Sequence, residues 1–434
     1  MQTGNEGPNT SFRVAADAPA GYAQGGPRRS GSARPGSVEG RLLRMLLNVF
    51  GDPRVRMVLW NGDAVCTSAE PPVATMHIAD RPTLIRLCAD PDLQFGESYS
   101  AGAIRVEGDL SQLLEELYRG AAAPTSANAI SLARRVAHAL HRRPENTLTG
   151  SRDNIHHHYD IGNEFYSLWL GATMAYTCAY YPTPAASLDE AQAAKMDHVC
   201  RKLRLRPGQM VAEAGCGWGS LALHMARHYG VRVRAFNISR EQIAYAREHA
   251  KAEGLDRAVE FIEDDYRNIT GVYDAFASVG MLEHVGVENY PELGRLIHKH
   301  LKRDGLGLIH TIGRNRWKPM HRWIDRRIFP GANPPSLKQM MDIFEESSFS
   351  VLDVENIRLH YARTLEAWLA LFEASKERVA QMFDERFVRM WRLYLNGSIA
   401  AFRTGEMQLF QVVFAHGRNN EIPWTRADVY ERSG

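Results

Sequence analysis

The sequence predicts an α/β protein with a seven-stranded sheet and a smaller α+β domain ahead of it. The apolar segment Met210–Ala212 runs into the glycine-rich stretch Glu213–Gly219 and then into a helical pattern, which predicts a strand, a tight turn and a helix. Further along the chain, strand patterns alternate with helical ones, as they do in parallel sheets. The 434 residues, 44% of them hydrophobic, suffice for two or three domains with sizeable cores.

Charge and cysteine content exclude several classes of protein. A net charge of +2 is not that of a dedicated nucleic-acid binder, so no nucleic-acid partner is expected. Five cysteines without a Cys-x-x-Cys pair argue against a zinc site and a disulfide framework and suit a reducing cytoplasm. We find neither a membrane-spanning apolar run nor the apolar core of a signal peptide. We therefore expect a cytoplasmic protein whose membrane contact is peripheral.

The first 121 residues are predicted to form a tail and a small domain. Residues 1–38 are rich in Gly, Pro, Ser and Ala, which predicts a disordered tail. Residues 39–121 are predicted to be the α+β domain. Its elements are strands at Met57–Trp60 and Thr75–Ile78 and a helix from Leu110 to Leu117 that Asp109 caps.

A basic amphipathic helix is predicted within the connector, residues 122–150. Its apolar side carries Ile130, Val136 and Leu140, and its basic residues include Arg135 and Arg142. Such a helix can lie on an anionic bilayer. A linker helix surrounded by water is an equally good interpretation.

Residues 151–434 are predicted to form one α/β domain. A helix is predicted at Asp189–Leu205, followed by the strand and turn at 210–219. The strands predicted after the turn are Val231–Phe236, Val259–Ile262, Ala275–Val279, Leu306–Ile312, Val351–Val354 and Gln408–Phe414, with helices beginning at Ser239 and after Tyr290.

The glycine turn predicts a cofactor site. Glycines allow the backbone to turn sharply and to approach a ligand where a Cβ would obstruct it. The carboxylate of Glu213, at the strand end, can accept hydrogen bonds from the ligand. The pattern Glu-x-Gly-x-Gly-x-Gly resembles motif I of class I S-adenosylmethionine (SAM) methyltransferases, with their Rossmann-like sheet. It differs from the dinucleotide fingerprint Gly-x-Gly-x-x-Gly, so SAM is favoured over NAD.

Five more motifs narrow this resemblance. They are Asn154–Asn163, Tyr176–Tyr180, Ser278–Gly286, Leu308–Gly313 and Ile328–Gly331. In order and over nearly the whole of residues 150–434, they resemble the cyclopropane-fatty-acyl-phospholipid synthases and the related mycolic acid cyclopropane synthases. Gly96–Tyr99 and Val106–Asp109 resemble the N-terminal domain of the phospholipid-acting branch, which implies lipid binding or dimer contacts there.

The resemblance implies a reaction. A methylene from SAM is added across a cis double bond of an unsaturated acyl chain in a membrane phospholipid, with bicarbonate as the base. The positions that match the bicarbonate site are Cys178, Glu283, His310, Ile312 (through its backbone) and Tyr361. The partner is then a phospholipid bilayer, met at the inner face of the membrane, and a homodimer is a family-level expectation.

The resemblance also implies the residues that bind SAM. Gly215, Gly217 and Gly219, with Glu213, are expected at its methionine part. The other expected contacts are Tyr159, Tyr176, Thr177, Asn237, Gln242, Asp265 and Tyr266. Asn237 stands where many class I enzymes have an acidic residue, and the loop Ala332–Pro335 also departs from the family's usual form, which leaves the ribose contacts and the acyl range open.

Structural roles are the alternatives for these residues. Cys178 is an ordinary buried residue in many proteins, and His310 lies in an apolar strand, where a histidine is often a hydrogen-bonded part of the core. Their motifs favour the functional interpretation. The run His156–His158 does not predict a metal site, because consecutive helical residues do not face one way and no carboxylate cluster accompanies it.

The segment Arg314–Phe329 predicts a membrane-facing surface. It interleaves Arg314, Arg316, Lys318, Arg322, Arg326 and Arg327 with Trp317, Trp323, Ile328 and Phe329. Basic residues meet lipid phosphates and tryptophans suit the interface. The alternative is a solvated helix whose tryptophans face the core.

Two other functions compete with cyclopropane formation. A fatty-acyl C-methyltransferase shares the first step but gives a methyl- or methylene-branched chain. A non-catalytic lipid-binding protein with a methyltransferase fold is the second, and the intact glycine turn with Cys178, Glu283, His310 and Tyr361 argues against it.

Overall fold

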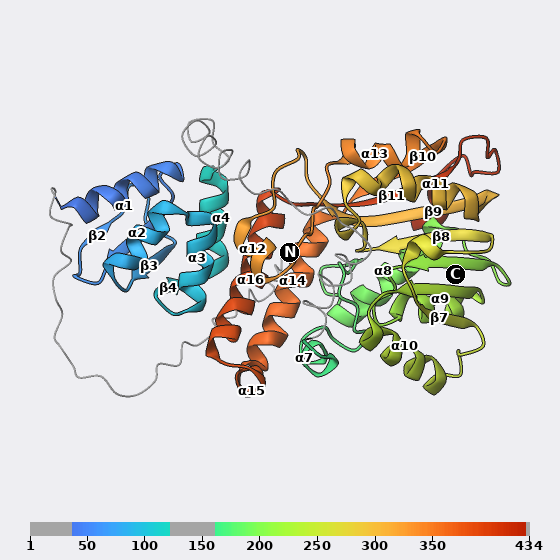
Figure 1. The fold of residues 1–434 in the computed structure, drawn as a ribbon, viewed down its shortest axis with the longest axis horizontal. Helices are drawn as coiled ribbons and strands as arrows, with labels where there is room; N and C mark the ends of the chain where they lie inside the picture. The colour runs from blue at the N-terminus through green and yellow to red at the C-terminus, as the bar shows by residue number, and fades with distance from the viewer. Residues whose placement is uncertain (1–36, 122–160, 431–434) are drawn as a thin grey trace, which may run out of the picture.

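A computed structural model describes residues 37–121 and 161–430 (Figure 1). The predicted tail, the predicted linker helix, the His156–His158 run and Tyr159 lie outside the described residues, apart from Ser37 and Val38. These two residues begin the first helix rather than end a tail, because the Ser37 hydroxyl accepts from the amide of Gly40 and caps α1.

The N-terminal domain is a four-stranded sheet with four helices. Strand order is β2-β1-β3-β4, with β1 and β3 parallel and the outer pairs antiparallel. In β1 and β3 every second side chain is buried, as expected of a sheet covered on one face. Asp109 accepts from the amide of Gln112 and caps α4, as predicted. The elements are α1 (Val38–Val49), β1 (Val55–Leu59), β2 (Ala64–Val65), β3 (Ala74–Ile78), α2 (Arg81–Ala89), α3 (Pro91–Ser100), β4 (Ile104–Gly108) and α4 (Leu110–Ala121).

The second sheet has the predicted seven strands, in the order β10-β11-β9-β8-β5-β6-β7. They are β5 (Met210–Ala214), β6 (Arg232–Asn237), β7 (Val259–Glu263), β8 (Tyr273–Val279), β9 (Leu301–Gly313), β10 (Phe349–Asn356) and β11 (Gln408–His416). Strand β11 runs antiparallel to both of its neighbours, so the sheet is not wholly parallel. The reason is that the helices between β10 and β11 lie beyond one end of the sheet, and the chain re-enters the sheet from that end.

Helices cover both faces of this sheet. On one face α8 (Leu188–Lys202), α9 (Ser220–Tyr229) and α10 (Arg240–Ala252) bury a core with residues of β5, β6 and β7. On the other, α11 (Tyr290–His300) and α13 (Leu337–Glu345) bury a second core. Ser187 caps α8 with a capping box, which explains where that helix begins.

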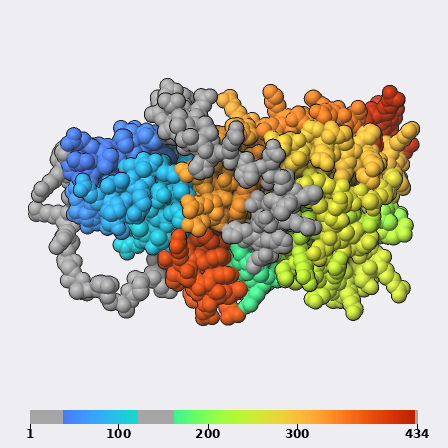
Figure 2. Space-filling model, viewed as in Figure 1, coloured from blue at the N-terminus to red at the C-terminus, as the bar shows by residue number. Residues whose placement is uncertain are grey.

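A group of helices stands between the two sheets (Figures 1 and 2). It comprises α12 (Arg322–Arg327), α14 (Arg358–Ala374), α15 (Lys376–Met382) and α16 (Glu385–Thr404), with the short α7 (Asn163–Ser167) nearby. Its core is continuous with that of the N-terminal domain, from Leu43 on α1 to Trp368 on α14. The last described helix, α17 (Ala427–Tyr430), packs on α8.

Candidate active site

The glycine turn has the backbone that its sequence predicts. Gly215, Gly217 and Gly219 have φ of 81°, 55° and 88°, a region that residues with a Cβ rarely adopt. A Cβ on Gly219 would lie 2.5 Å from the ring of Phe261, so this glycine allows α9 to approach β7. A Cβ on Gly217 would meet no atom within 4 Å, and Gly217 lines an open cavity.

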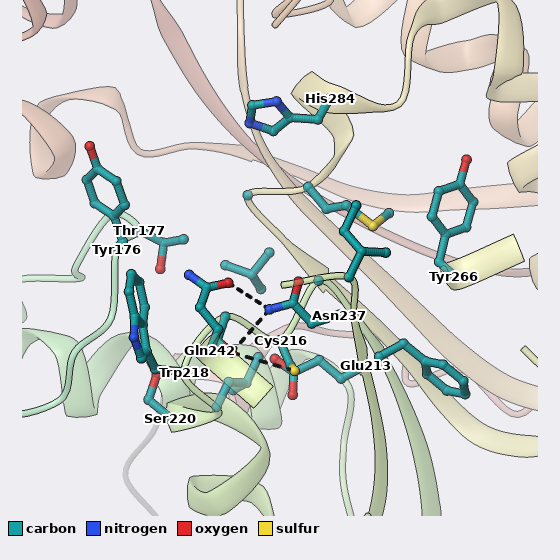
Figure 3. A pocket seen from close by; sticks show the side chains of 18 of the residues that line it. Tyr176, Thr177, Glu213, Cys216, Trp218, Ser220, Asn237, Gln242, Tyr266 and His284 are labelled. Carbon is teal, nitrogen blue, oxygen red and sulfur yellow. Dashed lines mark hydrogen bonds between the residues drawn. The ribbon is translucent and has the colours of Figure 1, made fainter. Parts of the chain in front are cut away.

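This first cavity lies where the parallel strands end and brings most of the predicted SAM residues together (Figure 3). Its walls include Tyr176, Thr177, Glu213, Gly215, Gly217, Asn237, Gln242, Asp265 and Tyr266. Gly219 lies behind the wall as the N-cap of α9. Ligand sites of open α/β sheets are expected at the carboxyl ends of the strands.

Asn237 and Gln242 form one side of the first cavity. The amide nitrogen Nδ2 of Asn237 donates to Gln242 Oε1 at 2.7 Å and to the carbonyl of Gly217 at 3.3 Å. The side chain at the end of β6 is therefore fixed to the glycine turn and to the first turn of α10. Asp265 also lines this cavity, is buried, accepts from the amide of Arg267, and directly precedes Tyr266.

Two buried ionisable side chains, Lys195 and Glu213, line this cavity, and Lys195 was not among the predicted site residues. Lys195 on α8 is 2% exposed and its Nζ donates to Thr177 Oγ1 at 2.7 Å. Burial lowers the pKa of Lys195 and raises that of Glu213. The signal for Lys195 is its position: it directly precedes Met196 and lies four residues before Val199, on the predicted buried face of the helix.

A second cavity contains all five residues predicted for catalysis: Cys178, Glu283, His310, Ile312 and Tyr361. The rest of its wall is mainly apolar and includes Phe329, Leu365, Leu393, Phe402 and Leu409. The two cavities share Tyr176, Thr177, Gly280 and His284. The two cavities therefore meet at these four residues, which form the junction. The polar cluster, made of Cys178, Glu283, His310 and Tyr361, lies close to this junction.

Glu283 is held by one of its two carboxylate oxygens. It is 6% exposed, and Oε1 accepts from the backbone amide of Ile312 at 2.6 Å. Oε2 is buried without a hydrogen-bond partner among the described residues. Burial raises the pKa of Glu283 to about 7. The amide of Ile312 thus donates to Glu283, and the role of the Ile312 backbone at a bound anion stays a prediction.

His310 is fixed as a neutral donor. Gln411 on β11 donates its amide to Nδ1 at 3.0 Å, so the ring proton is on Nε2. Burial lowers the pKa of His310 well below its usual value. Nε2 has no partner within the described part of the chain and borders the second cavity.

Cys178 and Tyr361 complete the cluster. Cys178 is fully buried, its thiol donates to the carbonyl of Ala179 at 3.1 Å, and burial raises its pKa, so it remains a thiol. Tyr361 packs its ring against Phe402. Another residue that the sequence did not single out is Tyr394, whose hydroxyl lies 2.8 Å from that of Tyr176 at the junction. It lies on α16, whose helical periodicity alone does not distinguish it from a core residue.

The predicted membrane-facing segment mostly contacts other parts of the protein, which corrects that interpretation. Arg322 pairs with Asp90, and Arg327 with Glu97, both on the N-terminal domain. Trp323 is 3% exposed. Further residues with internal partners or buried side chains are Arg314, Lys318 and Ile328. Carboxylates at α3 attract these guanidinium groups. Of the basic and aromatic set, Arg316, Trp317, Lys318 and Arg326 are exposed, and Lys318 pairs with Glu406.

Within residues 37–121 and 161–430 no group of acidic, histidine or cysteine side chains is arranged to hold a metal ion. In the same residues, no helix combines the length and the apolar character needed to cross a bilayer.

The strand order, the glycine turn and the cavity beside it define a class I SAM-dependent methyltransferase. A family model described as mycolic acid cyclopropane synthetase matches residues 146–412, and this chain belongs to that family. A model described as a domain of unknown function matches residues 42–128.

Individual proteins agree with this assignment. Over 397 residues the chain is 35% identical to a probable fatty acid methyltransferase of Pseudomonas putida, covering 87% of this chain and 96% of that one. Over 266 residues it is 41% identical to the cyclopropane-fatty-acyl-phospholipid synthase of Escherichia coli K12, and the match covers 61% of this chain and 68% of that one. The structure of mycolic acid cyclopropane synthase CmaA1 complexed with SAH and CTAB has a TM-score of 0.58 at 29% identity, covering 63% of this chain and 99% of that one.

Proposed function

We propose that this chain transfers a one-carbon unit from SAM to the cis double bond of an unsaturated acyl chain in a membrane phospholipid and closes a cyclopropane ring. The observation that carries the proposal is the junction of the two cavities. A cavity lined by the methyltransferase glycine turn meets, at Thr177 and Gly280, a second, strongly apolar cavity that Glu283 and His310 line.

The chemistry requires such a junction. An alkene is a weak nucleophile, so it must be held in line and in contact with the methyl group. SAM supplies that methyl group as an activated sulfonium. The carbocation that follows is trapped by water, so the apolar walls around Leu365, Phe402 and Leu409 have to keep the site dry.

A proton must also leave the new methyl group, and the cluster fits a small anion that would accept it. Glu283 Oε2 and His310 Nε2 are buried polar atoms without partners in the described structure, one an acceptor when ionised and one a donor. With Cys178 and Tyr361 they would hold bicarbonate, which supplies a base. The Ile312 amide orients Glu283 in this arrangement.

The proposal is tested with the full chain, SAM and vesicles of dioleoyl phosphatidylglycerol. We expect release of S-adenosylhomocysteine and lipid products whose proton NMR spectrum shows cyclopropane signals. Removing dissolved carbon dioxide should lower the rate and added bicarbonate should restore it. No S-adenosylhomocysteine with any unsaturated lipid would leave only a binding role.

A second candidate is a fatty-acyl C-methyltransferase that forms a methyl- or methylene-branched chain. It is favoured by one observation: the match to the Pseudomonas putida fatty acid methyltransferase covers 87% of this chain, against 61% for the Escherichia coli synthase. A methylene-branched product and a cyclopropane are isomers, so mass does not separate them. Vinylidene protons in place of cyclopropane protons would decide for this candidate.

A phospholipid substrate requires peripheral association with a membrane, and we propose its cytoplasmic face as the site. Sedimentation with anionic vesicles tests it, and light scattering of the free protein tests the homodimer.

A further inference from the structure

The second cavity is not completed by the catalytic domain alone. Four residues of the N-terminal domain form part of its wall: Phe95 and Gly96 on α3, and Leu114 and Tyr118 on α4. Leu114 and Tyr118 are four residues apart and therefore lie on one face of the helix. None of the four borders the first cavity, so this wall lies away from the junction where the methyl group is transferred.

The contact between the domains at this wall is very close. A Cβ on Gly96 would lie 2.4 Å from ring atoms of Trp323, and Trp323 itself borders the cavity. The absence of a Cβ at Gly96 thus allows α3 to pack directly against the indole ring of Trp323 on α12. The N-terminal domain meets the catalytic helices without a gap at this point.

Polar contacts hold the domain in this position. Glu97 accepts from Arg327 at 2.6 Å and from Arg386 at 3.3 Å, and Glu115 accepts from Arg403 at 3.0 Å. These carboxylates are mostly buried and their guanidinium partners partly exposed, and each contact is a charge-assisted hydrogen bond, which is stronger than a neutral one. In addition, the Ser111 hydroxyl and Asn396 Oδ1 are 2.7 Å apart in a buried hydrogen bond. The wall is therefore a fixed surface.

We propose that this wall, made of Phe95, Gly96, Leu114 and Tyr118, limits the length of acyl chain that the enzyme accepts. The inference rests on the proposed function, since it concerns the acyl substrate. A fixed apolar surface at a distance from the reacting carbon contacts the part of the chain beyond the double bond. A chain too long for the space must displace packed side chains, and one too short leaves apolar surface uncovered.

Leu114 offers a test with a matched control on the same helix. Leu114→Ala enlarges the cavity and Leu114→Trp reduces it. Leu113→Ala makes the same truncation one residue earlier, at a fully buried position that does not border the cavity. Each full-length variant is given SAM and mixed phosphatidylglycerol vesicles whose cis-monounsaturated chains have about 14, 16, 18 and 20 carbons in equal amounts. Products are measured by mass spectrometry of the methyl esters.

We expect Leu114→Ala to raise the ratio of longest to shortest product by about fourfold per additional methylene accommodated, and Leu114→Trp to lower it. Leu113→Ala should lose stability but keep the wild-type product ratio. Calorimetry should show the wild-type SAM affinity in all three variants. If Leu114→Trp does not fold, the comparison of the two alanine variants decides. If Leu114→Ala is active and its product ratios are unchanged, the chain-length inference is wrong but the proposed function stands. The same holds if its rate changes equally for chains of every length. A wild type without product at any length overturns the proposed function as well.

Discussion

Glu283 combines a fixed and a free carboxylate oxygen in one buried side chain. The bond from the Ile312 amide orients the group, and the second oxygen has no partner in the described structure. Such an arrangement is costly for folding, because an ionised carboxylate is poorly solvated there. Active sites commonly carry this kind of strain, which makes Glu283 the residue where function and stability are expected to oppose each other.

Glu283→Gln tests that opposition. Glutamine keeps the acceptor for Ile312 but not the charge, so we expect turnover to fall roughly 100-fold or more while SAM still binds. The folded pKa of Glu283, about 7, exceeds its usual 4.5. Its contribution to stability is therefore full below pH 4.5 and is lost as pH rises through 7.

Relative to wild type, the variant should accordingly gain stability with rising pH, by up to roughly 3 kcal/mol above pH 8. Denaturant unfolding at several pH values measures this difference. A difference independent of pH would contradict the raised pKa, and unchanged turnover would remove Glu283 from the mechanism.

Gly217 allows the cofactor cavity to be tested separately from the fold. Its φ is positive and a Cβ would enter open space, so Gly217→Val should fold with a modest loss of stability and no longer bind SAM. Gly254→Val is the control, because Gly254 also has a positive φ and open space but lies outside the cavity. Calorimetric titration with SAM should show no binding by Gly217→Val and wild-type affinity for Gly254→Val. Full affinity in the Gly217 variant would mean that the cofactor binds elsewhere.

At the scale of elements, α8 supports the wall of the cofactor cavity. It carries Lys195, which holds Thr177, and Gln192, whose amide donates to the carbonyl of the same threonine at 3.0 Å. One helix thereby fixes the segment 174–178, which contributes to both cavities. The helix acts through two buried polar side chains rather than through apolar packing alone.

Lys195→Met should lower SAM affinity by about tenfold. The substitution removes the hydrogen bond from Lys195 that positions Thr177 in the wall of the cofactor cavity. Lys202→Met on the same helix is the matched control: Lys202 is equally buried but pairs with Glu355 and Asp353, outside the cavity. It should lose stability without losing affinity. Equal affinities for the two variants would show that Lys195 has only a structural role.

At the scale of the molecule, the N-terminal domain and the catalytic helices share one core, whereas the far strands of the large sheet belong to another. Leu84→Ala, in the N-terminal domain, removes a fully buried side chain and should cost about 2–5 kcal/mol. Hydrogen exchange should then show lost protection in β1 and β3 and also in α16, while β6 and β7 keep theirs. Unchanged protection in α16 would show that the two parts open independently.

Much of the fold could be predicted because its signals are local. The alternation of elements gave all seven strands within a few residues, and the capping of α4 and the backbone of the glycine turn depend on neighbouring residues alone. The antiparallel β11 was not foreseen, because strand direction depends on where the helices before it pack. The role of Arg322 and Arg327 was misjudged for a similar reason: their partners, Asp90 and Glu97, are about 230 residues away.

The amino-acid sequence by itself determined the cofactor turn and the succession of strands and helices, since these follow from backbone geometry and the period of apolar residues over short stretches. The family resemblance led us to expect Cys178, Glu283 and His310 at one site, but only the tertiary structure decided that this site borders an apolar cavity and that the N-terminal domain closes part of that cavity. The physical reason is that a cavity is formed by surfaces from distant segments, and the free energy that joins them comes from burial and charge pairing across those distances.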